Sequence, residues 1–129
     1  MSLVLHCPEV FDGDQFSRQV CVRVQGGSFS QVGPVDAVAP AVDALHVAAD
    51  YLVTPGLIDL QVNGGGGVLF NERPDLEGVR QMARAHARCG TTALLPTFIT
   101  DSPQGRARAV DAVRQALQAA EPGIVGIHL

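Results

Sequence analysis

The chain has 129 residues, of which 47% are hydrophobic and 17% charged, and its formal net charge is -4. This length lies within the range of single domains, and the apolar fraction is too high for a disordered segment. The acidic balance argues against a general nucleic-acid binder. No apolar run reaches the roughly 18 residues of a membrane span, and no secretory signal is recognisable, so we expect a cytoplasmic protein without a membrane partner.

The first part of the chain predicts a small antiparallel β domain over residues 1–53. Val20, Val22 and Val24 alternate with more polar neighbours, which is the period of a half-buried strand. Gly26-Gly27 then predicts a hairpin turn. Further strands are predicted over 28–32, 44–48 and 51–53, with a proline-bearing loop over 33–40. Residues 1–3 carry no pattern and are assigned to no strand. Three widely spaced cysteines without a CxxC pair predict reduced thiols.

The pattern changes after Thr54, where strands and helices begin to alternate. Leu57 to Val62 is a near-continuous apolar strand, of the kind that parallel sheets bury on both faces. The next elements are a helix opened by Pro74-Asp75 and closed by Cys89-Gly90, a strand over 91–99, a helix capped by Ser102 with a core stripe of Val110, Val113 and Leu117, and a third strand over 124–129. This order predicts a parallel α/β fold, either a doubly wound sheet or the start of a (β/α)₈ barrel.

Polar side chains recur on one face of the first apolar strand. Asp59, Gln61 and Asn63 alternate with aliphatic residues and therefore point the same way. At the C-terminal end of a barrel strand the usual partner of such side chains is a substrate, a metal or its bound water. A satisfied structural network is the competing interpretation.

The run Pro55-Gly56-Leu57-Ile58-Asp59, followed by two residues at i and i+2, resembles the first barrel strand of the amidohydrolase superfamily. In that superfamily the pair is normally His-x-His. The Gln61-Val62-Asn63 variant with its glycine-rich loop resembles the N-acetylglucosamine-6-phosphate deacetylases, and 95–100 and 126–129 resemble the second and third strands of the same family. The resemblance implies the first three β/α units of a TIM-type barrel over 54–129, preceded by strands of a small β-sandwich-like domain.

The resemblance also implies an activity. The full-length protein is expected to be a metal-dependent amide hydrolase that converts N-acetylglucosamine 6-phosphate to glucosamine 6-phosphate and acetate. It is expected to use one divalent metal ion, Zn²⁺ first with Fe, Co or Ni as alternatives, to bind a phosphorylated amino sugar and to form a homodimer. The alternatives are an amidohydrolase acting on another N-acyl sugar or a cyclic amide, and a noncatalytic α/β module.

The site residues follow from the motif. Carboxamides are poorer Zn²⁺ ligands than imidazoles, so we assign Gln61 and Asn63 to a substrate or water beside the metal, with Asp59, Gly64 and His128 adjacent to the site. In the family, the counterpart of His128 precedes Leu-Glu-Gly-Pro, whose Glu is a metal ligand, and this chain ends one residue before that Glu. Firm metal ligands and catalytic residues are therefore expected beyond Leu129, and the 129-residue chain alone is expected to be inactive. The alternative role for His128 is that of a buried, hydrogen-bonded strand histidine.

Two further patterns admit a functional and a structural interpretation. The run Gly64 to Gly67 could bind an anion through successive backbone N–H groups. The favoured interpretation is that these glycines let the backbone come close to a neighbouring group, because the GxxxxGK[ST] order of a phosphate-binding loop is absent from the run. Arg80, Arg84 and Arg88 recur at four-residue spacing on one helix. We expect them to form a solvated helix face and not a site for an anionic partner.

Overall fold

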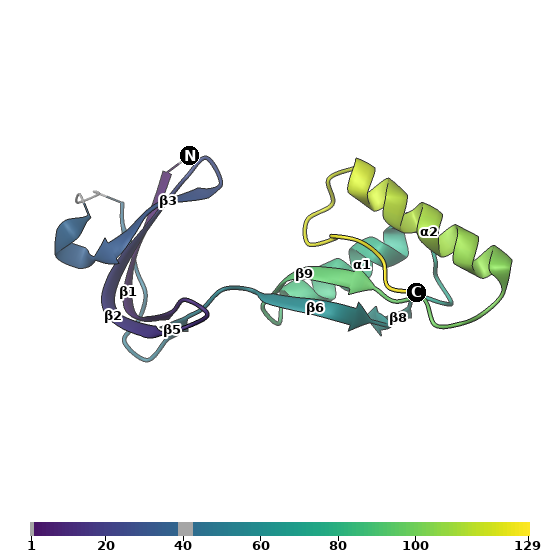
Figure 1. Cartoon of the computed structure of the whole chain (residues 1–129), viewed down its shortest axis with the longest axis horizontal. Helices are drawn as coiled ribbons and strands as arrows, with labels where there is room; N and C mark the ends of the chain where they lie inside the picture. The colour runs from purple at the N-terminus through teal and green to yellow at the C-terminus, as the bar shows by residue number, and fades with distance from the viewer. Residues whose placement is uncertain (1, 39–42) are drawn as a thin grey trace. The chain divides into compact units, whose positions relative to one another are not determined.

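A computed structural model describes residues 2–38 and 43–129 (Figure 1). The chain divides into two compact units, Met1–Pro55 and Gly56–Leu129. No helix among the described residues has the length and apolar character needed to cross a membrane.

The first unit is a five-stranded mixed sheet. Strands β1 (Ser2–Phe11), β2 (Phe16–Gln25) and β3 (Ser28–Pro34) pair antiparallel in sequence order. The short strands β4 (Leu45–His46) and β5 (Leu52–Val53) pair parallel to β1, on the side away from β2. The expectation of a purely antiparallel unit is therefore wrong for the last two strands. β4 and β5 thus lie at the edge of the sheet opposite to β3 and run in the direction of β1.

The ends of these strands also differ from the prediction. Ser2 and Leu3 pair with Gln25 and Val24, so the beginning of the chain is part of β1. The expected loop over 33–40 includes the last two residues of β3 and a 3₁₀ helix, Val35–Ala37, while positions 39 and 40 lie outside the described residues. Period-two alternation missed β1 because its apolar residues lie on both faces of the strand.

Both faces of this sheet carry a small apolar cluster. Val4, Cys21 and Val38 pack on one face, and Cys7, Val20 and Val22 pack on the other. Cys7 and Cys21 are buried and Cys89 is exposed, and all three are free thiols. The pKa of the Cys7 thiol is raised, mainly because the thiol is buried and to a lesser extent because of the nearby Cys21.

The second unit is built around a parallel pair of strands. β6 (Leu57–Val62) pairs with β9 (Thr91–Pro96), and the connection between them contains the hairpin of β7 (Gly64–Gly65) and β8 (Val68–Leu69) and the helix α1 (Leu76–Ala87) (Figure 1). α2 (Pro103–Gln118) follows β9. The chain then returns beside β9 through two isolated parallel bridges, Leu94 to Ile124 and Thr97 to His128. The parallel α/β arrangement is confirmed, whereas in the described residues the third expected strand consists only of these bridges.

The structure confirms the predicted starts of both helices and the glycine turn after the first one, whereas α2 ends at Gln118, before the Pro122-Gly123 signal that was predicted to end it. The Asp75 carboxylate accepts a hydrogen bond from the Gly78 N–H at 2.7 Å, and Gly90 closes the following turn with φ +92°. The Ser102 hydroxyl accepts from the Gly105 N–H at 3.1 Å.

The buried stripe of α2 differs from the predicted one. Val113 is buried, but Val110 and Leu117 are 40% and 47% exposed. The buried positions are mainly small residues, Gly105, Ala109, Ala112 and Ala116. Each residue turns a helix by 100°, so positions one step away from the alanines face outward. The buried stripe was predicted to consist of the largest apolar side chains of the helix. In the structure it consists mainly of glycine and alanine, whose small size lets α2 pack closely against the rest of the unit.

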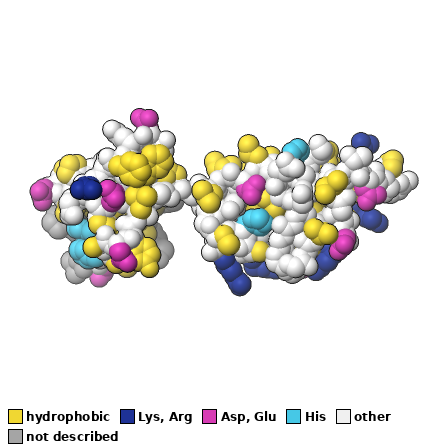
Figure 2. All heavy atoms as spheres, turned by 90° about the horizontal axis from the view of Figure 1, so that it is seen from below, with side chains coloured by type: hydrophobic (Ala, Val, Ile, Leu, Met, Phe, Trp, Pro, Cys, Tyr) yellow, Lys and Arg dark blue, Asp and Glu magenta, His cyan; other side chains and the backbone are white. Residues whose placement is uncertain are grey.

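Strand β6 is less covered than the apolar pattern predicted. Leu57, Ile58 and Leu60 are 61%, 67% and 63% exposed, and Val62 alone is buried in this strand. Within the described residues β6 pairs with β9 on one side only. Hydrophobic side chains therefore lie at the surface between polar ones, as the space-filling view shows (Figure 2).

Candidate active site

The candidate site is centred on the C-terminal end of β6. The Val62 carbonyl accepts a hydrogen bond from the Thr97 N–H at 2.8 Å, and the Asn63 carbonyl accepts from the Phe70 N–H at 2.9 Å. These bonds tie the strand end to β9 on one side and to the residue after β8 on the other. The positions of Gln61 and Asn63 are thus determined by backbone contacts.

The two polar residues of β6, Asp59 and Gln61, and Asn63 directly after the strand differ in environment. Asp59 is half-buried, and its carboxylate accepts from the Gln61 N–H at 3.1 Å. Gln61 and Asn63 are exposed, although the sequence pattern had indicated burial. The difference arises because nothing in the described part of the chain covers this face of β6. Their carboxamides are available to an external ligand as donors and acceptors.

His128 reaches the same strand end from a distant part of the sequence. Its backbone N–H donates to the Pro96 carbonyl at 3.0 Å, and its Nδ1 lies 3.1 Å from the Leu60 carbonyl oxygen. A carbonyl oxygen only accepts, so Nδ1 carries the proton and a neutral ring leaves Nε2 as a free acceptor. The half-buried ring thus makes the hydrogen bond that was expected of a structural strand histidine, and its Nε2 can still accept a hydrogen bond from a ligand.

The glycine run forms the β7–β8 hairpin and packs on α1. Gly66 and Gly67 have φ +63° and +84°, which is the left-handed region that a tight hairpin turn needs. The Gly66 carbonyl accepts from the Gln81 side chain at 2.7 Å, and the Gly64 carbonyl lies 3.0 Å from Nε2 of His86. A Cβ on Gly64 would lie 2.2 Å from the Val68 carbonyl oxygen. Close backbone approach therefore accounts for the glycines.

A clamp that the sequence pattern did not reveal joins the hairpin segment to the end of β9. The Asn71 side chain donates to the Ile99 carbonyl at 2.8 Å and accepts from the Ile99 N–H at 2.9 Å. Two bonds to one residue hold the loop after β9 in a single position. The only signal available in the sequence was an asparagine shortly after a glycine turn, which is too common to identify a contact across 28 residues.

The same loop borders a hollow of about 130 Å³, lined by Phe98, Thr100, Asp101, Arg106 and Leu129. The pKa of the Asp101 carboxyl is lowered, mainly by a hydrogen bond from the Ser102 N–H and to a lesser extent by one from the Asn71 side chain. Asp101 is therefore a stable anion at neutral pH. No motif in the sequence indicates a role for this residue.

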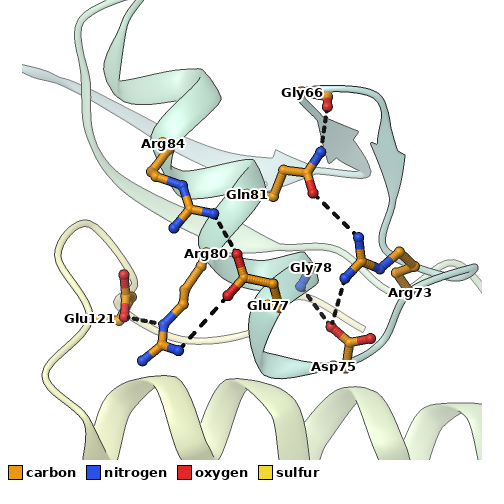
Figure 3. A network of polar contacts seen from close by, with 9 residues as sticks. All are labelled: Gly66, Arg73, Asp75, Glu77, Gly78, Arg80, Gln81, Arg84 and Glu121. Atoms are coloured by element: carbon orange, nitrogen blue, oxygen red, sulfur yellow. Dashed lines mark hydrogen bonds and ion pairs between the residues drawn. The ribbon is translucent and has the colours of Figure 1, made fainter.

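The arginine face of α1 is an ion-pair network (Figure 3). Arg80 Nε lies 2.8 Å from Glu121 and Arg84 lies 2.6 Å from Glu77. Arg73 joins the same region, because it donates to Gln81 at 3.3 Å and lies 3.7 Å from Asp75. Arg84 and Arg88 are exposed and Arg80 is half-buried, so the face is largely solvated as expected, and Arg80 and Arg84 in addition pair with carboxylates of the same unit.

Metal ligands are not gathered at this strand end. In residues 2–38 and 43–129 no group of three His, Cys, Asp or Glu side chains is placed to hold a metal ion. Gln61 and Asn63 offer carboxamide oxygens only, which are weak ligands for a borderline ion. The described residues at the end of β6 therefore do not by themselves fit a metal centre.

Comparisons with known proteins point to one group of enzymes. The N-acetylgalactosamine-6-phosphate deacetylase of Shewanella sp. (strain ANA-3) is 55% identical over 73 residues, which is 57% of this chain and 18% of the relative. The N-acetylglucosamine-6-phosphate deacetylase of Haemophilus influenzae is 31% identical over 112 residues, which is 87% of this chain and 29% of the relative. No protein-family model matches the chain.

Comparison of the fold with solved structures points to the same group of enzymes. The crystal structure of N-acetylglucosamine-6-phosphate deacetylase from Pasteurella multocida matches with a TM-score of 0.90 at 29% identity, over 99% of this chain and 34% of that protein. The chain thus spans about a third or less of the lengths of these relatives. The resemblance read from the Pro55–Asp59 run and the Gln61-x-Asn63 pair is confirmed: this chain is similar in sequence and in fold to part of the amino-sugar-6-phosphate deacetylases.

Proposed function

We propose that this chain is part of a metal-dependent hydrolase that deacetylates N-acetylglucosamine 6-phosphate, releasing glucosamine 6-phosphate and acetate. The observation that carries the proposal is the match over 99% of the chain to a deacetylase of that substrate, at a TM-score of 0.90. The Gln61-x-Asn63 pair at an accessible strand end supports it. We further propose that the protein works in the cytoplasm as a homodimer.

A second candidate substrate is N-acetylgalactosamine 6-phosphate. It is supported by the 55% identity over 73 residues to a deacetylase of that sugar, compared with 31% over 112 residues to a deacetylase of the glucosamine derivative. The two sugars differ only in the configuration at C4. One set of acetate-release assays with both sugars therefore separates the candidates.

The proposed architecture places 54–129 in the first three β/α units of a (β/α)₈ barrel and 1–53 in a small β domain. A barrel pairs each strand on both sides and covers its outer face with helices. The exposed Leu57, Ile58 and Leu60, and the single partner of β6, support this arrangement because they are the surfaces that such a barrel buries.

In this proposal the residues of the chain bind and orient the substrate. The exposed carboxamides of Gln61 and Asn63 offer N–H donors and carbonyl acceptors, which suit the hydroxyl and acetamido groups of an amino sugar. His128 presents Nε2 because the Leu60 carbonyl holds Nδ1. Asp59 and Gly64 support the strand end, the former through the Gln61 N–H and the latter through the hairpin.

We propose one divalent metal ion as cofactor, with Zn²⁺ as the first choice and Fe, Co or Ni as alternatives. The donor set in this chain does not complete a centre, so no reaction step is assigned to the ion here. On the same ground the 129-residue chain alone is proposed to be inactive.

The first test is the intact mass of the natural protein under denaturing conditions, followed by acetate release from both sugars. The proposal expects a mass roughly three times 13.5 kDa, activity on one or both sugars, and loss of activity on chelation. A protein of that mass that releases acetate from neither sugar would contradict the proposal. A mass of 13.5 kDa without activity would favour the noncatalytic module.

Gln61→Ala tests the site itself. Removal of a substrate hydrogen bond, whose loss costs about 1–3 kcal/mol, lowers kcat/KM by roughly 5- to 150-fold. Gln104→Ala, which changes an exposed glutamine on α2, is the matched control and leaves kcat/KM unchanged. Equal activity of the two variants would remove Gln61 from the site.

A further inference from the structure

Two histidines in the first unit lie side by side on adjacent strands. His6 in β1 is directly opposite His46 in β4 in the parallel register, so their side chains leave the sheet on the same face. Their ring centroids are 4.6 Å apart with an interplanar angle of 44°. The Val47 N–H donates to the His6 carbonyl at 2.9 Å and keeps the two strands together at this point. The two imidazoles are thus neighbours by backbone geometry.

The pair borders an open hollow of about 340 Å³. Pro8, Gln19 and Val35 are also among the lining residues. Gln19 has φ +52°, a left-handed conformation that is uncommon for a residue other than glycine, and the β1–β2 ladder is interrupted opposite Pro8. Such backbone conformations cost free energy and recur at ligand-binding sites. The strained residue therefore lines the same hollow as the histidine pair.

Neutral imidazole is the commonest protein ligand of transition metals. Metal–nitrogen bonds are about 2.0–2.1 Å long, so two nitrogens that share one ion lie roughly 3 Å apart. Two rings already in contact reach this separation by small side-chain rotations. His46 is exposed and His6 half-buried, so an ion can enter from solvent, and the hollow has room for water to complete its coordination.

We propose that His6 and His46 chelate one divalent transition-metal ion of the kind that favours imidazole, such as Ni²⁺, Cu²⁺ or Zn²⁺. No third strong ligand is grouped with the pair in the described residues, so the site is exchangeable and takes two ligands from the protein. The bound ion links β4, which has only two residues, to β1 across 40 positions of sequence. Binding therefore stabilises the edge of the sheet. This inference does not rest on the proposed deacetylation.

Ni²⁺ is the probe, because it binds imidazole and its paramagnetism broadens the signals of nearby protons. The experiment uses the natural full-length protein carrying Cys89→Ser, which removes an exposed thiol that would compete for the ion. We expect substoichiometric Ni²⁺ to broaden the ring signals of His6 and His46 before that of His86, which lies outside both the histidine pair and the proposed active site. Hydrogen exchange of the Val47 amide is expected to slow as Ni²⁺ binds.

Calorimetry on His6→Asn and His46→Asn measures the contribution of each ligand. Each substitution is expected to weaken Ni²⁺ binding by at least about tenfold, since one of two protein ligands is lost. His86→Asn is the matched control and is expected to keep the wild-type affinity at this site. Wild-type affinity in both His6→Asn and His46→Asn would overturn the proposal. If a substitution prevents folding, the broadening experiment on the unsubstituted histidines decides alone: equal broadening of the His6, His46 and His86 rings would refute the site.

Discussion

The Asn71 clamp gives a sharp test of how the site end of the second unit is held. In Asn71→Ala both hydrogen bonds to the Ile99 backbone are lost. A protein hydrogen bond contributes a net 0.5–1.5 kcal/mol, so two bonds contribute roughly 1–3 kcal/mol. Ile99 is exposed, and water can replace part of what is lost. We therefore expect a local destabilisation of about 1–2 kcal/mol, in the lower part of that range.

The assay is amide hydrogen exchange at Ile99, whose N–H donates to the Asn71 side chain. A loss of about 1–2 kcal/mol corresponds to exchange that is roughly 5- to 30-fold faster. Asn71→Asp retains an acceptor oxygen and is expected to keep most of the protection at this amide. Glu72→Ala, at the exposed neighbouring position, is the control. Unchanged exchange at Ile99 in Asn71→Ala would refute the reasoning, because the loop would then be held by other contacts.

Three further predictions concern the second unit. Gly66→Ala and Gly67→Ala both place a side chain at positive φ, and each is expected to lower the free energy of unfolding in urea by about 1–2 kcal/mol. Gly66→Ala is expected to lower it more, because the new Cβ would also lie 3.2 Å from the Ala85 Cβ. Equal costs would contradict this contact. Phe70→Ala removes a fully buried ring and is expected to lower the free energy of unfolding by about 3–5 kcal/mol; a loss below about 1 kcal/mol would show that the ring lies outside the core. The pKa of Asp101 is lower in the folded protein than its ordinary value of 3.8. Its carboxylate therefore stabilises the fold fully at pH values above 3.8, and this contribution is lost as the pH falls through the lower pKa of the folded state. The melting temperatures of wild type and Asp101→Asn should therefore converge in acid, and a gap independent of pH would contradict the assignment.

Local chemistry accounts for what could be predicted of the fold. The caps at Asp75 and Ser102 and the closing Gly90 are encoded within a few residues, so these three features followed from the sequence. The shared face of Asp59 and Gln61 also followed, because alternation along a strand is a local property.

Contacts between distant residues could not be predicted in the same way. The parallel pairing of β4 and β5 with β1 depends on which edge of the sheet these short strands join and in which direction they run, and no local pattern contains that information. The approach of His128 to Leu60 spans 68 positions, and the Asn71 clamp spans 28. The exposure of Gln61 was missed because burial depends on which neighbours cover a face, and a strand pattern contains only the strand.

The alanine stripe of α2 has a consequence for how this sequence can change over evolutionary time. Ala109, Ala112 and Ala116 are fully or almost fully buried, and a Cβ on Gly105 would lie 2.9 Å from the Phe98 ring. Most single-nucleotide changes of an alanine codon introduce a larger or charged side chain, and packed interiors tolerate added volume poorly. Random mutation at these positions is therefore biased toward the direction that the structure resists. The helix face is narrowly constrained in sequence although none of its alanines carries any chemistry.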